Sequence, residues 1–117
     1  MVSKSSDHMQ RVSMKVNSEQ IAVIRRAFEI VGQTDDQIAT GVVVNYMERC
    51  RAKPHLSITS YAYADLNESD EYSRLDITLT EGQLRLLDKI CAKKREARGK
   101  LIRWIIADTA EQAGYPR

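Results

Sequence analysis

Hydrophobic and polar residues alternate one by one along the stretch RLDITLT, which runs from Arg74 to Thr80. Leu75, Ile77 and Leu79 are apolar, and the residues between them are polar. Because successive side chains of an extended chain point to opposite faces, this pattern predicts a half-buried β-strand. The residues after Thr80 have helical spacing. The strand therefore needs a partner from elsewhere in the chain to satisfy its backbone hydrogen bonds.

A repeat within the sequence supplies the partner. A shift of 63 residues without gaps places RVSMKVNSEQIAVIRRAF on RLDITLTEGQLRLLDKIC. The apolar positions coincide, although few residues are the same. The identical pairs are Arg11/Arg74, Gln20/Gln83 and Glu48/Glu111. The apolar positions recur although the residues at them differ. This is expected of two copies of one fold that share a core.

Each copy is predicted to be a strand followed by two helices. Asn17 or Ser18 in the first copy, and Thr80 in the second, can cap the next helix by accepting its free backbone N–H bonds. The first helix of copy one is expected to stop at Gly32, and Thr34 is expected to cap the second helix. Copy two has KKREARGK at the equivalent place and no evident stop between its helices.

The predicted fold class is mostly α with a two-stranded antiparallel β-ribbon. Two strand–helix–helix (βαα) units pair within one chain as an intramolecular pseudo-dimer, and the apolar face of the ribbon rests on the helices. The strands are expected to bury Val12, Met14, Val16, Leu75, Ile77 and Leu79. The first helices are expected to bury Ile21, Ile24, Phe28, Val31, Leu84, Leu87 and Ile90. Phe28 and Trp104 are expected to be core aromatics.

The expected boundaries place all of the structure in one domain over residues 10–117. They comprise a disordered tail over 1–9, a first unit over 10–50, a linker over 51–73 and a second unit over 74–117. The chain length suits a single domain. The linker reaches about 75 Å when extended, so it can join the two strands into one ribbon.

Charge is distributed unevenly along the chain. Residues 74–117 carry ten Lys and Arg against six Asp and Glu, whereas residues 10–50 carry five of each. This asymmetry favours a polyanionic partner, although a solvated helix face gives the same composition. No apolar run is long enough for a membrane span, and the N-terminus lacks a signal-peptide core. A cytoplasmic protein with no membrane partner is therefore expected.

Candidate chemistry is sparse. Cys50 and Cys91 are expected to be reduced packing thiols, and no Cys/His spacing indicates a metal site. There is no glycine-rich phosphate loop, carboxylate pair or Ser/Cys–His arrangement, so an enzyme is not expected. Neither a cofactor nor a small-molecule ligand is expected.

The motifs RLDITLTEGQLRLLDKI and RGKLIR of copy two resemble the ribbon–helix–helix DNA-binding superfamily. The resemblance covers about 80 of the 117 residues. Most members have one copy and dimerise, whereas this chain is similar in layout to the tandem TraY-type accessory proteins of conjugative plasmids. It departs from the family pattern at Arg95, where glycine is usual, and at Asp35 and Asp36, where small polar or basic residues are usual.

The resemblance implies that the ribbon enters the major groove of double-stranded DNA and reads bases with its outward side chains. Arg and Lys bond guanine, Asp accepts from cytosine N4, and Ser or Thr suits several base edges. The base-reading candidates are Arg11, Ser13, Lys15, Arg74, Asp76 and Thr78. The alternative is that they are polar residues on a solvated sheet face. Because the two strands differ, the preferred site is not expected to be palindromic.

Phosphates are expected at the start of each second helix, where free N–H groups and the helix dipole attract anions. The phosphate-binding candidates are Thr34 in copy one and Arg95, Arg98 and Lys100 in copy two, where the three cations are expected to cluster. Asp35 and Asp36 would repel a phosphate, so the two copies are expected to hold DNA unequally.

These features together predict a sequence-specific double-stranded DNA-binding protein that acts as a transcriptional repressor or regulator. Self-association on adjacent DNA sites is plausible by the same resemblance. One alternative is a relaxosome-type accessory protein that binds a conjugative transfer origin. A second, from a different class, is an antitoxin-like protein-interaction module.

Overall fold

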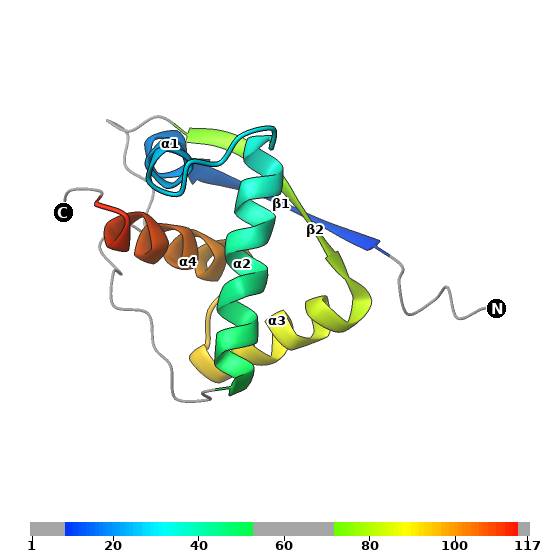
Figure 1. The fold of residues 1–117 in the computed structure, drawn as a ribbon. Coiled ribbons are helices and arrows are strands. Elements are labelled where there is room, and N and C mark those ends of the chain that lie inside the picture. Colours follow the sequence, from blue (N-terminus) through cyan, green and yellow to red (C-terminus); the bar gives the residue numbers. More distant parts are fainter. Residues whose placement is uncertain (1–8, 53–71, 115–117) are drawn as a thin grey trace.

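The computed structural model describes residues 9–52 and 72–114, which form two strands and four helices (Figure 1). In chain order they are β1 (Met9–Asn17), α1 (Ser18–Ala27), α2 (Asp35–Ala52), β2 (Tyr72–Thr80), α3 (Glu81–Lys94) and α4 (Arg98–Gln112). The fold is mostly helical with one two-stranded antiparallel sheet, as the periodicity predicts. Among the described residues, no helix combines the length and the apolar character needed to cross a membrane.

The element boundaries differ slightly from the expected ones. β1 begins at Met9, so the last residue of the expected 1–9 tail belongs to the strand. α2 continues to Ala52 and β2 begins at Tyr72, so both elements extend into the expected 51–73 linker. The rest of the tail and of the linker lies outside the described residues.

The register of the ribbon has the symmetry of the sequence repeat. β1 and β2 pair antiparallel over nine residues each, with Ser13 opposite Asp76 at the centre. These two residues are also 63 positions apart in the chain. Exchanging every strand residue for its counterpart in the repeat therefore returns the same set of cross-strand pairs.

One face of the ribbon lies in the hydrophobic core. The predicted inward residues of both strands are buried: Val12, Met14, Val16, Leu75, Ile77 and Leu79. The helices cover them with further buried side chains, among them Ile21, Ile24, Ile38, Val43, Leu87, Leu101 and Ile105. Leu84, Ile90 and Trp104 are partly buried against this core. A two-stranded ribbon is marginal alone, and this packing stabilises it.

The first helix after each strand begins where the sequence predicts. The Asn17 side chain accepts hydrogen bonds from the backbone N–H groups of Glu19 and Gln20, at 2.9 and 3.2 Å. Thr80 and Gln83 form a reciprocal capping box, in which each side chain accepts from the other residue's backbone N–H, at 3.1 and 2.9 Å. Both caps satisfy N–H groups that an α-helix leaves unpaired in its first turn.

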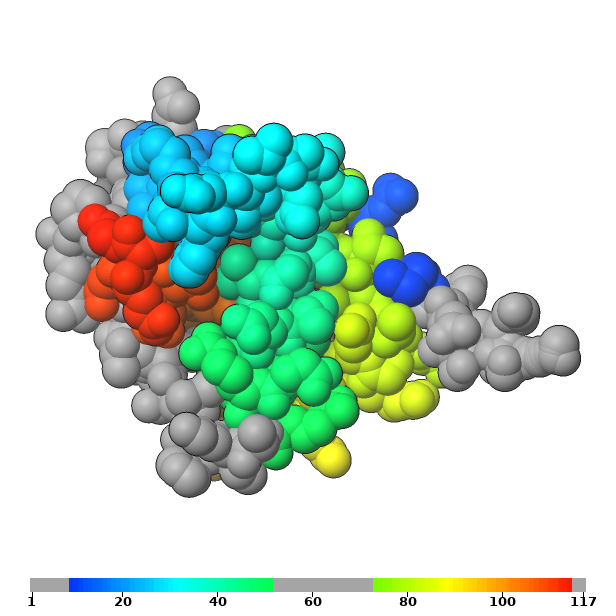
Figure 2. Space-filling model, in the orientation of Figure 1, coloured from blue at the N-terminus to red at the C-terminus, as the bar shows by residue number. Residues whose placement is uncertain are grey.

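A helix that is distant in sequence packs against each strand of the ribbon. α2 packs along β2, where the backbone N–H of Thr78 donates to the Thr40 hydroxyl at 3.4 Å. α4 packs along β1, and a Cβ added at Gly99 would lie 3.7 Å from the Cβ of Met14. Figure 2 shows α2 between the α1 region and α3, with the end of α4 beside it. The Thr40 contact satisfies a backbone N–H of β2, which helps to protect this strand from pairing with other chains.

The end of α1 departs from the prediction. The helix stops at Ala27 rather than at Gly32, and Glu29 takes the left-handed conformation, with φ of 52°. The expectation that Phe28 and Val31 face the core is therefore wrong, because these side chains are 60% and 90% exposed.

Local hydrogen bonding and one apolar contact explain the early stop. The N–H of Ile30 donates to the carbonyl of Arg25 at 3.0 Å, and that of Glu29 donates to Arg26 at 3.2 Å. This pair of bonds around a left-handed residue is the Schellman motif. Ile30 packs against the core, and together with buried Ile24 it lines a groove on the surface. An apolar contact of this kind commonly accompanies the motif and favours closure here.

α3 ends through the same motif three positions later in the repeat. The N–H of Arg95 donates to Ala92, and that of Glu96 donates to Cys91, at 3.3 and 3.0 Å. Arg95 is left-handed, with φ of 58°, and its counterpart Gly32 has φ of 81°. The stop that the sequence of copy two does not reveal is thus made by an arginine in a conformation that glycine adopts more easily.

Candidate nucleic-acid interface

The outward face of the ribbon carries the six residues for which the resemblance implies base reading. Five of them are exposed, and Asp76 is partly exposed. They form three cross-strand pairs, which are Arg11/Thr78, Ser13/Asp76 and Lys15/Arg74. The period-two pattern therefore places all six side chains on the face opposite the core.

Three positive charges on this face are not neutralised by any described residue. Among the described residues, Arg11, Lys15 and Arg74 have no ion-pair partner. Lys15 and Arg74 also lie directly opposite each other. Like charges placed opposite each other in a ribbon destabilise it, and a bound polyanion relieves the repulsion.

The only acidic residue among the six is held by a hydrogen bond across the ribbon. The Ser13 hydroxyl donates to the Oδ1 atom of Asp76. The bond fixes the orientation of the Asp76 carboxylate. The oxygen atoms of an ionised carboxylate can only accept hydrogen bonds.

An open hollow continues this face over the first turns of α2. It has a volume of about 610 Å³, and it brings residues of both strands together with α2. Its lining includes Arg11 and Thr78 from the ribbon, and Asp36, Gln37 and Thr40 from α2. Asp36 is thus the acidic residue of α2 that lies beside the ribbon face.

The start of α2 is capped as predicted. The N–H of Gln37 donates to the Thr34 hydroxyl at 3.2 Å, and the N–H of Thr34 donates to the Gln37 side chain at 2.8 Å. Asp35 accepts a 2.6 Å hydrogen bond from Arg25 of α1. The charge that was expected to repel phosphate at Asp35 is therefore paired within the protein.

The start of α4 has no side-chain cap, because Ala97 occupies the cap position. The basic residues near this helix start were expected to cluster. In the structure, Arg98 and Lys100 contact different side chains of the protein. Arg98 binds Asp88 of α3 in a bidentate manner, at 2.7 and 2.8 Å. Lys100 lies over the Trp104 ring, 5.5 Å from the centroid. Arg95 is exposed at the preceding turn.

The Arg98–Asp88 contact changes the acidity of both groups. The hydrogen bonds and the charge of the guanidinium hold the pKa of Asp88 below its usual value. The same hydrogen bonds raise the pKa of Arg98.

Sequence reasoning missed these two ion pairs, which occupy counterpart positions with exchanged charges. Arg25 corresponds to Asp88 in the repeat, and Asp35 corresponds to Arg98. A search of the repeat for counterpart positions with one acidic and one basic residue would have found them.

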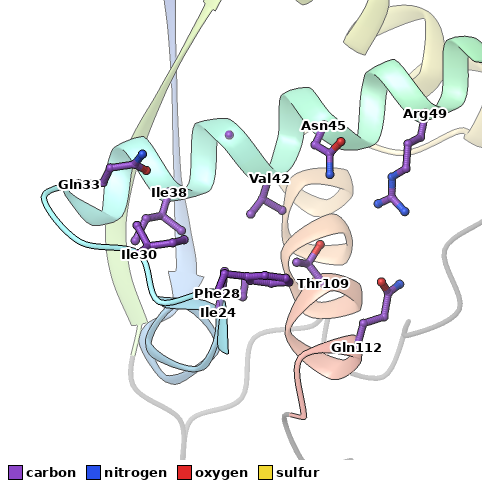
Figure 3. Close-up of a pocket in the computed structure, with 11 residues that line it drawn as sticks. Ile24, Phe28, Ile30, Gln33, Ile38, Val42, Asn45, Arg49, Thr109 and Gln112 are labelled. Atoms are coloured by element: carbon purple, nitrogen blue, oxygen red, sulfur yellow. The ribbon is translucent and has the colours of Figure 1, made fainter. Parts of the chain in front are cut away.

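A second concave surface lies on the other flank of α2, and it too was not predicted. This groove has a volume of about 310 Å³, and residues that follow the early end of α1 line one side of it. Figure 3 shows Phe28 and Ile30 from the α1–α2 connection, with Val42 of α2 and Thr109 of α4 across from them. Because Gly41 lines both hollows, α2 separates the groove from the ribbon face.

No protein-family model, curated protein sequence or solved structure matches this chain. The candidate function therefore depends on the ribbon face and the helix ends themselves.

Proposed function

We propose that this protein binds double-stranded DNA sequence-specifically by inserting its β-ribbon into the major groove. The observation that carries the proposal is the outward ribbon face, where Arg11, Lys15 and Arg74 are exposed and unpaired by the described protein. A two-stranded ribbon fits the major groove, and these side-chain types bond base edges there. The inward face is occupied by the core, which leaves the outward face for a ligand.

The proposed architecture is a pseudo-dimer of two βαα units, as in the ribbon–helix–helix superfamily. Three observations support it. The ribbon register is unchanged by the 63-residue exchange. The second helix of each unit covers the strand of the other, since α2 lies along β2 and α4 along β1. The first helix of each unit is capped at a counterpart position, by Asn17 and Thr80.

Phosphate contacts belong at the starts of α2 and α4, which flank the ribbon. At α2 the candidate is Thr34 with the neighbouring backbone. At α4 the candidates are Arg95, Arg98 and Lys100, beside the helix start that lacks a side-chain cap. Arg98 uses two hydrogen bonds to hold Asp88, and an exposed surface ion pair of this kind can be released at low cost when a phosphate binds.

The biological role we propose is that of a transcriptional repressor or regulator. The alternative is an accessory protein at a conjugative transfer origin, which the tandem layout favours by analogy. Selection of bound sequences from a random duplex library, followed by location of the site relative to promoters and nick sites, distinguishes the two roles.

The DNA-binding proposal is tested by Arg74→Ala, with Arg49→Ala as a matched control. Arg49 is an exposed cation near the end of α2, beside the groove rather than the ribbon. We expect Arg74→Ala to cost about 1–3 kcal/mol on the selected site and to relax base choice there. Arg49→Ala should change binding much less. Fluorescence anisotropy on the selected and random duplexes measures both, and equal losses for the two variants on both duplexes would exclude the ribbon as the reading element.

A further inference from the structure

The side chains of the outward ribbon face do not keep the symmetry of the register at any of the three cross-strand pairs. Under the 63-residue exchange, Arg11/Thr78 at one end corresponds to Lys15/Arg74 at the other. The arginines are identical counterparts, so the two ends differ only by Thr78 against Lys15.

The central pair lies on the axis of the exchange and is asymmetric as well. Ser13 and Asp76 are counterparts of each other, and the serine hydroxyl donates to the carboxylate. One carboxylate with a fixed orientation therefore stands between two cationic ends. It accepts hydrogen bonds from the amino groups of cytosine or adenine, whereas guanine offers only acceptors in the major groove.

The end that carries Lys15 and Arg74 has two exposed cations facing each other and no acidic partner in the described chain. Each of them suits the O6 and N7 acceptors of a guanine. The opposite end has one such cation, Arg11, beside the Thr78 hydroxyl and methyl group.

We infer that the ribbon reads a directional DNA site. Guanines are selected most strongly at the Lys15/Arg74 end, an amino-bearing base is selected at the centre, and one guanine is selected at the Arg11/Thr78 end. The inference rests on the proposed DNA-binding function and adds the polarity and base pattern of its target. The arginines are common to both ends. The direction of the DNA site is therefore set by Thr78, Lys15 and the central pair.

The test restores the symmetry that the sequence lacks. Asp76→Ser with Thr78→Lys gives both strands the outward series Arg-Ser-Lys. Ser13→Asp with Lys15→Thr gives both strands Arg-Asp-Thr. The two double variants change net charge in opposite directions, so a shared effect on site symmetry cannot be an effect of charge. Circular dichroism checks that each remains folded, which is expected because the altered side chains are outside the core.

Duplexes selected by the natural protein should be non-palindromic, and inverting the Lys15-side half-site should weaken binding by roughly tenfold. Duplexes selected by either double variant should be palindromic, with guanines at both ends for Asp76→Ser/Thr78→Lys. A palindromic site for the natural protein would overturn the inference, and so would a folded double variant that keeps the natural directional site. In both cases DNA binding itself would stand. Absence of salt-dependent duplex binding by the natural protein would instead reject the proposed function.

Discussion

The Arg98–Asp88 contact holds a candidate DNA-contacting cation on an acidic side chain of the same protein. Both side chains are nearly half exposed, so the pair contributes only about 0.2–1 kcal/mol to folding. A phosphate at the start of α4 competes with Asp88 for the same guanidinium. Asp88 therefore weakens the affinity of the free protein for any duplex, if Arg98 is a phosphate contact.

Replacing Asp88 by Asn should raise affinity for a random duplex severalfold at low salt and steepen the salt dependence by up to about one unit of slope. Glu48→Gln is the matched control, because Glu48 pairs with Arg51 near the end of α2, away from the proposed phosphate contacts. Fluorescence anisotropy at several salt concentrations measures both variants. Unchanged or weaker duplex binding by Asp88→Asn would show that Arg98 does not contact DNA.

The same substitution has a defined dependence on pH. The pKa of Asp88 is lowered in the folded protein, so its contribution to stability is present above the unfolded value of about 3.9. That contribution is lost as the pH falls through the folded pKa. The natural protein should thus be slightly more stable than Asp88→Asn at pH 7, and the difference should vanish at the acid end of a denaturation series.

The residues of the candidate site were predictable to different degrees. The six ribbon residues follow from strict alternation, because in a strand the period alone decides which side chains face outward. The neighbours of Arg98 and Lys100 do not follow from the sequence. They depend on how the turn at Arg95 directs α4 against α3, and on the rotamers of long side chains at the surface.

Among the secondary-structure elements, the beginnings of the helices were predictable and the end of α1 was not. Caps such as Thr80 act through a short polar side chain on nearby N–H groups, so the local sequence contains the signal. The end of α1 could form at either of two positions, Glu29 or Gly32. Gly32 offers the easier left-handed residue, but closure at Glu29 lets Ile30 pack against the core. The packing gain is visible only in three dimensions, and Phe28 is exposed as a consequence.

The left-handed Arg95 gives a prediction in which stability and binding change in opposite directions. Arg95→Gly should stabilise the fold by about 0.5–1 kcal/mol, since glycine adopts this conformation without a Cβ clash. It should also weaken DNA binding, because a candidate phosphate contact is lost. Glu29→Gly is the control, as it relieves a left-handed residue without removing a cation. Denaturant unfolding and anisotropy measure the two effects, and full DNA affinity in Arg95→Gly would show that Arg95 does not contact phosphate.

Both strands of the ribbon belong to one chain, and a helix of that chain packs against each of them. The buried residues of β1 and β2 form one core with all four described helices, so neither strand–helix–helix unit has a complete core alone. Unfolding should therefore be a single cooperative event within the monomer. A two-chain ribbon would behave differently, because its strands would separate when the subunits dissociate.

The last prediction uses this difference. The midpoint of thermal unfolding should stay constant when the protein concentration is raised a hundredfold, and sedimentation at micromolar concentration should give a monomer. Intramolecular pairing makes the ribbon independent of concentration, whereas the stability of an obligate dimer rises with protomer concentration by mass action. A midpoint that rises with concentration, together with a sedimenting dimer, would mean that β1 of one molecule pairs with β2 of another. The proposed single-chain pseudo-dimer would then be replaced by an exchanged assembly with two ribbons, each of which could still present the same outward face to DNA.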